Sequence, residues 1–126
     1  MRNIEERVYR QRFIIESHYN KKVTKEMVGD FLLKLASKLD MHVHPDLPKP
    51  IVTSATGKSK KLHDGYEGVL FWLESGCVLY VWEKLNFLTL DIYSCKKFDD
   101  KKALKFAAEF FGLEDPSFNR VLYSSE

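Results

Sequence analysis

The chain has 126 residues, 44% of them hydrophobic, which is enough for one packed domain and excludes wholesale disorder. Twenty basic residues (Lys+Arg) against 18 acidic ones leave a formal net charge of +2, well short of the basic excess of a nucleic-acid-binding protein. No apolar run approaches the roughly 18 residues that span a bilayer, so we expect neither a nucleic-acid nor a membrane partner. Cys77 and Cys95 are too few for a disulfide framework, and these features together predict a cytoplasmic protein.

The start of the chain predicts an arm, a strand and a well-marked helix within a single domain that spans residues 1–126. Residues 1–10 are highly charged and are expected to form a flexible arm, and the β-prone residues 12–16 follow as a strand. Thr24 is placed to cap a helix, because apolar residues recur at helical spacing behind it as far as Leu39.

The middle of the chain is predicted to be extended. Residues 41–44 and 51–54 are expected to be strands, separated by a segment whose three prolines exclude a helix. Residues 56–65 are rich in lysine and glycine and are expected to form a mobile basic loop.

The second half predicts an antiparallel meander followed by a helix. Three apolar or alternating runs with short gaps are expected to be its strands, at residues 68–73, 77–82 and 87–93. Asp99 or Asp100 caps a helix that Gly112 ends, and residues 120–123 are expected to add an edge strand. The resulting order, β-α-β-β-β-β-β-α-β, predicts an α/β fold of the two-layer α+β type, an antiparallel sheet with two helices on one face.

The segment from 67 to 95 carries the clearest functional pattern. Its marked positions are Gly68-Val69 at the opening of a strand, Glu74-Ser75 at its end, Trp82 seven residues on, then Asp91, and Cys95 twenty residues after Ser75. This layout resembles the small prokaryotic S-adenosylmethionine decarboxylases, whose strand leads to Glu-Ser-His, then His-Thr-Trp-Pro-Glu and a strand ending in Asp-x-x-x-Cys. The resemblance covers about residues 11–111 and implies that family's fold.

In this family the serine is consumed to make the cofactor. The resemblance implies that the Ser75 hydroxyl attacks the carbonyl of Glu74, that a histidine helps to remove the serine Cα proton, and that cleavage leaves a pyruvoyl group. That group forms a Schiff base with the substrate amine, and the cysteine at the position of Cys95 reprotonates the product. The resemblance further implies that Trp82 stacks on the substrate adenine and that Glu16 faces the substrate.

Several positions depart from the family pattern. Tyr80 stands at the position of the processing histidine. The unperturbed pKa of a phenol is about 10, against about 6.5 for an imidazole, so a phenol is a poor base at neutral pH. Gly76 replaces the histidine after the serine, and Glu67 replaces the serine that assists cleavage. Glu83 and Lys84 replace the proline and glutamate that follow the tryptophan. The nucleophile and the later proton donor are retained, whereas the groups expected to make the cofactor are gone.

Each candidate site residue also has an ordinary structural interpretation. Ser75 suits a hairpin. Both Cys77 and Cys95 suit a packed core, and this interpretation is stronger for Cys77 because it lies inside an apolar run. Trp82 suits a core or an interface, and Glu16 suits an exposed strand position. Tyr80 and Trp82 alternate onto one face of their strand and are expected to line one pocket together.

Two further patterns are interpreted as structural. His42 and His44 share one strand face, but no third ligand follows at a typical spacing, so no metal is expected. The cluster of Lys58, Lys60 and Lys61 is interpreted as a solvated loop.

These observations lead to one functional hypothesis and one alternative. The hypothesis is a polyamine-biosynthesis-type homologue that is not self-cleaved, has no cofactor, and binds S-adenosylmethionine or a related nucleoside or amine. The alternative is an active pyruvoyl-dependent decarboxylase of S-adenosylmethionine or a basic amino acid, cleaved between Glu74 and Ser75, with His63 or Glu67 as a substitute base. The resemblance implies a homodimer in which two sheets face each other, and a predicted aromatic sheet face agrees with that.

Overall fold

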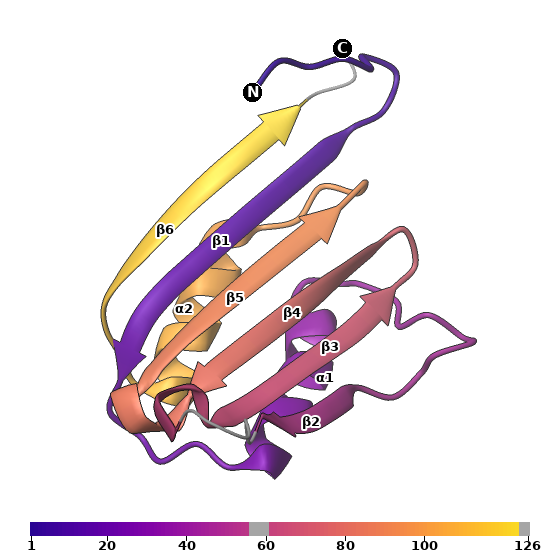
Figure 1. Ribbon diagram of the computed structural model, residues 1–126. Coiled ribbons are helices and arrows are strands. Elements are labelled where there is room, and N and C mark those ends of the chain that lie inside the picture. The colour runs from indigo at the N-terminus through magenta and orange to yellow at the C-terminus, as the bar shows by residue number, and fades with distance from the viewer. Residues whose placement is uncertain (56–60, 124–126) are drawn as a thin grey trace.

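The chain forms one six-stranded sheet and two α-helices (Figure 1). The structure is a computed structural model, and it describes residues 1–55 and 61–123. The elements are β1 (Arg10–Tyr19), α1 (Lys25–Lys38), β2 (Ile51–Ala55), η1 (Lys61–His63), β3 (Gly65–Trp72), β4 (Ser75–Trp82), η2 (Glu83–Leu85), β5 (Phe87–Ser94), α2 (Asp100–Phe111) and β6 (Leu113–Tyr123), of which η1 and η2 are 3-10 helices.

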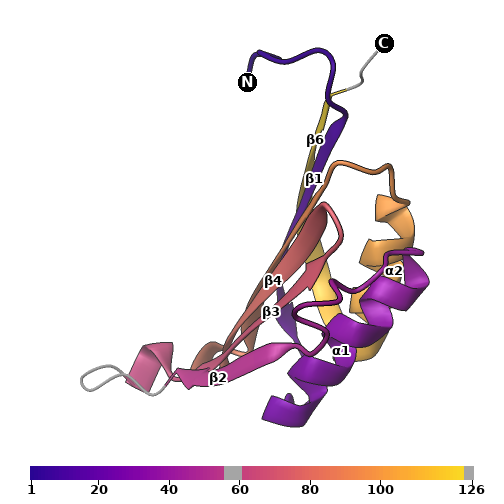
Figure 2. The same ribbon diagram turned by 90° about the vertical axis from the view of Figure 1, so that its right-hand side faces the viewer.

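The strands lie in the order β2-β3-β4-β5-β1-β6, and every neighbouring pair is antiparallel. Figure 2 shows both helices on the same side of this sheet, which leaves the opposite side uncovered. We call that uncovered side the open face. The predicted fold class, an antiparallel sheet with two helices on one face, is confirmed.

Side-chain alternation along the strands separates the core from the open face. On β5, Leu88, Leu90 and Ile92 are buried toward the helices, while the residues between them point to the open face, as predicted. Between the two helices, the ring centroids of Phe31 and Phe111 lie 4.7 Å apart, so α1 and α2 pack on each other as well as on the sheet.

Both helices begin and end where the sequence predicts. The Thr24 side chain accepts a hydrogen bond from the backbone N–H of Met27, and Asp99 accepts one from Lys102. Gly112 follows α2 with a left-handed φ of 67°, a conformation that glycine adopts without strain. These local signals are sufficient because they depend on residues within one turn of the helix end.

Two predictions of strands were wrong. Residues 41–44 form no strand; Val43 makes only an isolated bridge with Trp72. The observed order is therefore β-α-β-β-β-β-α-β. The last strand is longer than predicted and already begins at Leu113, although Pro116 lies within it. A proline is tolerated there because β6 is an edge strand, which pairs only with β1 and so has one unpaired side.

The predicted arm and loop also differ in extent. Arg10, predicted as part of the arm, is the first residue of β1, and residues 1–9 contain no helix or strand. Within the predicted basic loop, residues 56–60, and with them Lys58 and Lys60, lie outside the described residues. Residues 61–63 form η1, and Gly65 is already the first residue of β3.

Candidate functional site

Ser75 lies at the tip of the hairpin between β3 and β4, directly after a two-residue turn. Its hydroxyl donates to the carbonyl oxygen of Leu73 at 3.1 Å and lies 3.9 Å from the Met41 sulfur. Glu74, the second turn residue, has a left-handed φ of 59°, which costs a residue with a side chain about 1–2 kcal/mol. The backbone N–H of Cys95 donates to the carbonyl oxygen of Glu74 at 3.1 Å. The hairpin interpretation of Ser75 is confirmed, and the backbone of Cys95 lies next to the turn.

The two cysteines have different surroundings. Cys77 is buried in the core, as predicted, and burial raises the pKa of its thiol, so it is unreactive at neutral pH. Cys95 is half-buried, and its sulfur lies 3.3 Å from the hydroxyl of Tyr93. This contact and, to a lesser extent, burial raise the pKa of Tyr93. Tyr93 therefore stays protonated and is able to donate to the Cys95 sulfur.

The other predicted site residues lie further along the sheet. Glu67 on β3 pairs with Tyr80 on β4, Tyr80 pairs with Thr89 on β5, and Thr89 pairs with Glu16 on β1, so these four residues form one row across the open face. Trp82 follows on the same face as Tyr80, as the alternation predicted. The tilted Tyr80 and Trp82 rings have centroids 6.2 Å apart.

An aromatic row crosses the end of the open face. The ring centroids of Trp82 and Phe87 lie 5.4 Å apart, and those of Phe87 and His18 lie 5.5 Å apart. The indole N–H of Trp82 donates to Nδ1 of His63 at 3.2 Å. His63 is therefore in contact with Trp82, at the opposite end of β4 from Ser75.

The predicted residues thus form two groups rather than one. Ser75 and Tyr80 are five residues apart on the same strand, which at about 3.3 Å per residue is about 17 Å. Glu74 and Cys95 belong to the group at the hairpin, while Glu67, Glu16 and Trp82 belong to the other.

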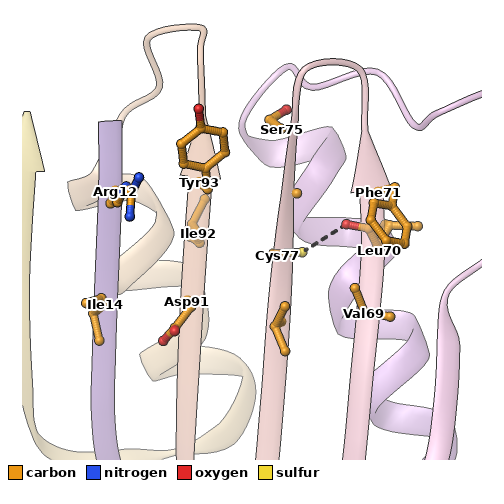
Figure 3. Close-up of a pocket in the computed structure, with 12 residues that line it drawn as sticks. Arg12, Ile14, Val69, Leu70, Phe71, Ser75, Cys77, Asp91, Ile92 and Tyr93 are labelled. Atoms are coloured by element: carbon orange, nitrogen blue, oxygen red, sulfur yellow. Dashed lines mark hydrogen bonds between the residues drawn. The ribbon is translucent and has the colours of Figure 1, made fainter. Parts of the chain in front are cut away.

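A cavity of about 450 Å³ hollows the open face beside Ser75 (Figure 3). It is bordered by side chains of β1, β5, β4 and β3, among them Arg12, Asp91, Tyr93 and Phe71. Burial raises the pKa of the Asp91 carboxyl. Sequence reasoning did not select Arg12, because nothing local indicates that β1 pairs with β5.

The structure also bears on metal binding and on membrane insertion. The described residues contain no group of three or more histidine, cysteine or acidic side chains that could hold a metal ion. None of the described helices has the length and apolar character needed to cross a membrane.

The comparisons with known proteins agree with this fold. The family model for S-adenosylmethionine decarboxylase matches residues 18–122. The chain belongs to the S-adenosylmethionine decarboxylase family. The solved structure of the adenosylmethionine decarboxylase from Aquifex aeolicus VF5 has a TM-score of 0.67 at 9% identity, covering 94% of this chain and 92% of that one. A likeness at this identity shows the shared fold. A comparison with curated proteins gives no match.

Membership of the S-adenosylmethionine decarboxylase family confirms the resemblance predicted from the sequence. The family is typically pyruvoyl-dependent, so the geometry at the hairpin bears directly on whether this member can make that group. The turn holds the Glu74–Ser75 peptide with a left-handed residue and a backbone donor, but the Ser75 hydroxyl faces the neutral carbonyl of Leu73.

Proposed function

We propose that this chain is an uncleaved, non-pyruvoyl homologue that binds S-adenosylmethionine or a related nucleoside or amine. The observation that carries the proposal is Tyr80 at the position of the family's processing histidine. Self-processing needs a base for the Ser75 Cα proton, the role that the resemblance gives to the histidine, and a group that takes up the proton of the Ser75 hydroxyl. The hydrogen-bond partners described for that hydroxyl are the Leu73 carbonyl and the Met41 sulfur, and neither accepts a proton at neutral pH.

The two substitute bases considered from the sequence do not lie near Ser75 in the same chain. His63 already accepts a hydrogen bond from Trp82, and Glu67 lies opposite Tyr80 on the neighbouring strand. Both are separated from the hairpin by most of the length of β4. Tyr80, the position of the missing imidazole, is itself about as far from Ser75, so in this arrangement a base at any of these three positions would reach the hairpin only from a second copy of the chain.

The residues at the hairpin fit only part of what a pyruvoyl group requires. The left-handed Glu74 and the N–H of Cys95 suit an attack on the Glu74 carbonyl, but among the described residues no basic side chain hydrogen-bonds to the Ser75 hydroxyl. We therefore expect the protein to work without this cofactor.

The ligand and partner assignments rest on the open face. Tyr80 and Trp82 present aromatic surface there, which suits stacking on a nucleoside base. Several large side chains on this face are exposed, including Phe71 at 44% and Ile51 at 47%, and exposed apolar surface of this kind suits a second copy of the chain. We propose a homodimer in which two open faces meet, with Glu16 and Glu67 at the edges of the ligand site.

One observation favours the alternative, an active pyruvoyl-dependent decarboxylase. The strained conformation of Glu74 and the hydrogen bond from Cys95 to its carbonyl are features that would assist cleavage before Ser75. In a homodimer with facing sheets, a side chain of the second copy is able to approach the hairpin. The group at the histidine position would still be the phenol of Tyr80, which is why we place this function second.

The mass of the freshly purified chain distinguishes the two functions. The proposal predicts one species of 14.8 kDa. The alternative predicts two fragments divided between Glu74 and Ser75, with the second blocked at its N-terminus by a pyruvoyl group, and detection of that pair would overturn the proposal. The variant Ser75→Ala is the control, because it cannot self-cleave and must give the uncleaved mass in either case.

Trp82 provides the test of ligand binding. The other tryptophan, Trp72, is 1% exposed, so a Trp72→Phe variant leaves Trp82 as the single fluorescent reporter on the open face. We expect S-adenosylmethionine to quench this signal and to raise the melting temperature of the unaltered chain. No quenching and no melting shift at millimolar ligand would remove this ligand from the proposal.

A further inference from the structure

A glycine lies at the floor of the cavity beside Ser75, between two large side chains. Gly76 on β4 pairs with Tyr93 on one side and with Phe71 on the other, so two large side chains flank a position that has none. The cavity measures about 450 Å³, within the range of small-molecule sites. In Figure 3, Arg12 and Tyr93 border it on one side and Phe71 on the other. Its walls are mainly apolar.

Two opposite charges border this cavity without being paired. Arg12 lies on β1 opposite Tyr93, and Asp91 lies on β5 opposite Ile14, so the two charged residues are diagonal neighbours on adjacent strands. Diagonal neighbours have Cα atoms about 7–8 Å apart. Among the described residues, however, neither has an oppositely charged group within 4.0 Å. The guanidinium carbon of Arg12 lies 5.2 Å from the centroid of the Tyr93 ring instead.

The neighbours of Asp91 on both adjacent strands are apolar. Its direct cross-strand neighbours on the open face are the apolar Ile14 and Val78. The loss of water contacts raises the pKa of its carboxyl, as expected for an acid that is partly desolvated without a compensating charge. An ammonium group on the ligand would provide that charge.

Arg12 is suited to the opposite group. A guanidinium offers a planar fork of donors that matches a carboxylate, and stacking on an aromatic ring holds that fork in place. Arg12 is held over Tyr93 in this way, at the rim of the cavity. We infer that the cavity binds the zwitterionic head of an α-amino acid, with its carboxylate on Arg12 and its ammonium group on Asp91.

This inference rests on the proposed function and specifies which part of the ligand is recognised. S-adenosylmethionine carries an α-amino-acid head, so the apolar walls would take its methylene chain. Decarboxylation removes the negative charge of the carboxylate, and an arginine paired with that charge stabilises the bound substrate more than the transition state. A guanidinium at this position therefore suits a protein that retains the carboxylate.

Calorimetric titration with ligands that differ only in the head tests the inference. We expect decarboxylated S-adenosylmethionine, which lacks the carboxylate, to bind the unaltered chain about 10- to 100-fold more weakly than S-adenosylmethionine. Arg12→Gln should remove this difference in affinity, because it weakens the binding of the carboxylate-bearing ligand alone. Asp91→Asn should weaken the binding of both ligands but not that of 5′-methylthioadenosine, which has no amino-acid head. Arg7→Gln, a charge removal at an exposed residue that pairs with Glu5, is the matched control and should change nothing.

The outcomes separate this inference from the proposed function. Equal affinity for S-adenosylmethionine and its decarboxylated form would overturn the role of Arg12 while leaving an adenosyl-binding protein. Binding of L-methionine but of no adenosyl compound would support the head site and overturn the adenosyl assignment. Absence of binding for every probe to a correctly folded chain, verified by its melting transition, would overturn both.

Discussion

Helix α1 packs tightly on the sheet at Gly68, and enlarging this residue tests how the layers pack. A methyl group built on Gly68 would lie 2.5 Å from Cγ1 of Val28 and 3.0 Å from Cδ1 of Leu32. Both neighbours are completely buried, so neither can rotate into open space. We therefore expect Gly68→Ala to push the helix away from β3 or to force its side chains out of their preferred rotamers.

The magnitude follows from two opposing effects. Replacing a strand glycine by alanine reduces the entropy lost on folding and contributes about 0.5–1 kcal/mol of stability. Overpacking a tight core costs about 1–3 kcal/mol, so the net expectation is a loss of roughly 0.5–2 kcal/mol. In a domain of this size each kcal/mol changes the melting temperature by about 3–5 °C. The expected decrease in melting temperature is therefore about 2–10 °C.

Gly29→Ala is the matched control, because Gly29 lies in α1 and its added methyl group would meet Val52 at an ordinary contact distance of 3.6 Å. There only the favourable helix effect remains, and we expect a gain of about 0.5–1 kcal/mol. Urea unfolding of both variants, followed by circular dichroism, measures the difference. Equal stability of the two variants would refute the close packing of α1 on Gly68.

Three further predictions concern the site. Glu74→Gly should relieve the left-handed strain and raise stability by up to about 1 kcal/mol, whereas Glu74→Ala should leave the melting temperature unchanged; a less stable glycine variant would contradict the strain. Native protein should expose one fast-reacting thiol, Cys95, to a thiol reagent, and denatured protein two; rapid labelling of Cys77 in the folded chain would contradict its burial. Because the pKa of Asp91 is raised, its ionisation disfavours folding. The free energy of unfolding of Asp91→Asn, relative to that of the parent chain, should therefore increase as pH rises from 3 to 7, by no more than about 0.5 kcal/mol. A relative stability that stays constant across this range would contradict this prediction.

The features that could be predicted from the sequence are those fixed by neighbouring residues. Thr24 and Asp99 cap their helices through bonds to backbone groups three residues away. The meander of β3, β4 and β5 has short connections, so adjacent strands in the sequence are adjacent in the sheet. The position of Ser75 at the hairpin tip and of Tyr80 and Trp82 on one face follows from the same local rules.

The features that could not be predicted depend on distant pairings. Strand β1 lies between β5 and β6, and this insertion places Arg12 beside Tyr93, 81 positions away in the chain (93 − 12 = 81). No local pattern determines which strand an isolated run such as 12–16 joins. The sequence does not predict the cavity either, because it shows Gly76 only in place of the family's histidine, whereas in the sheet this residue lies between two large side chains.

The separation of the two residue groups limits how one ligand can use both. The row of Arg12, Tyr93 and Gly76 and the row of His18, Phe87 and Trp82 are six residues apart along their strands, which is about 20 Å. An adenosyl ligand with its head on Arg12 cannot extend that far and also stack on Trp82 of the same chain. If both contacts are made at once, the tryptophan must come from a second copy whose open face meets the first. Ligand binding would then stabilise the association as well as the fold, and the apparent affinity would weaken as the protein is diluted.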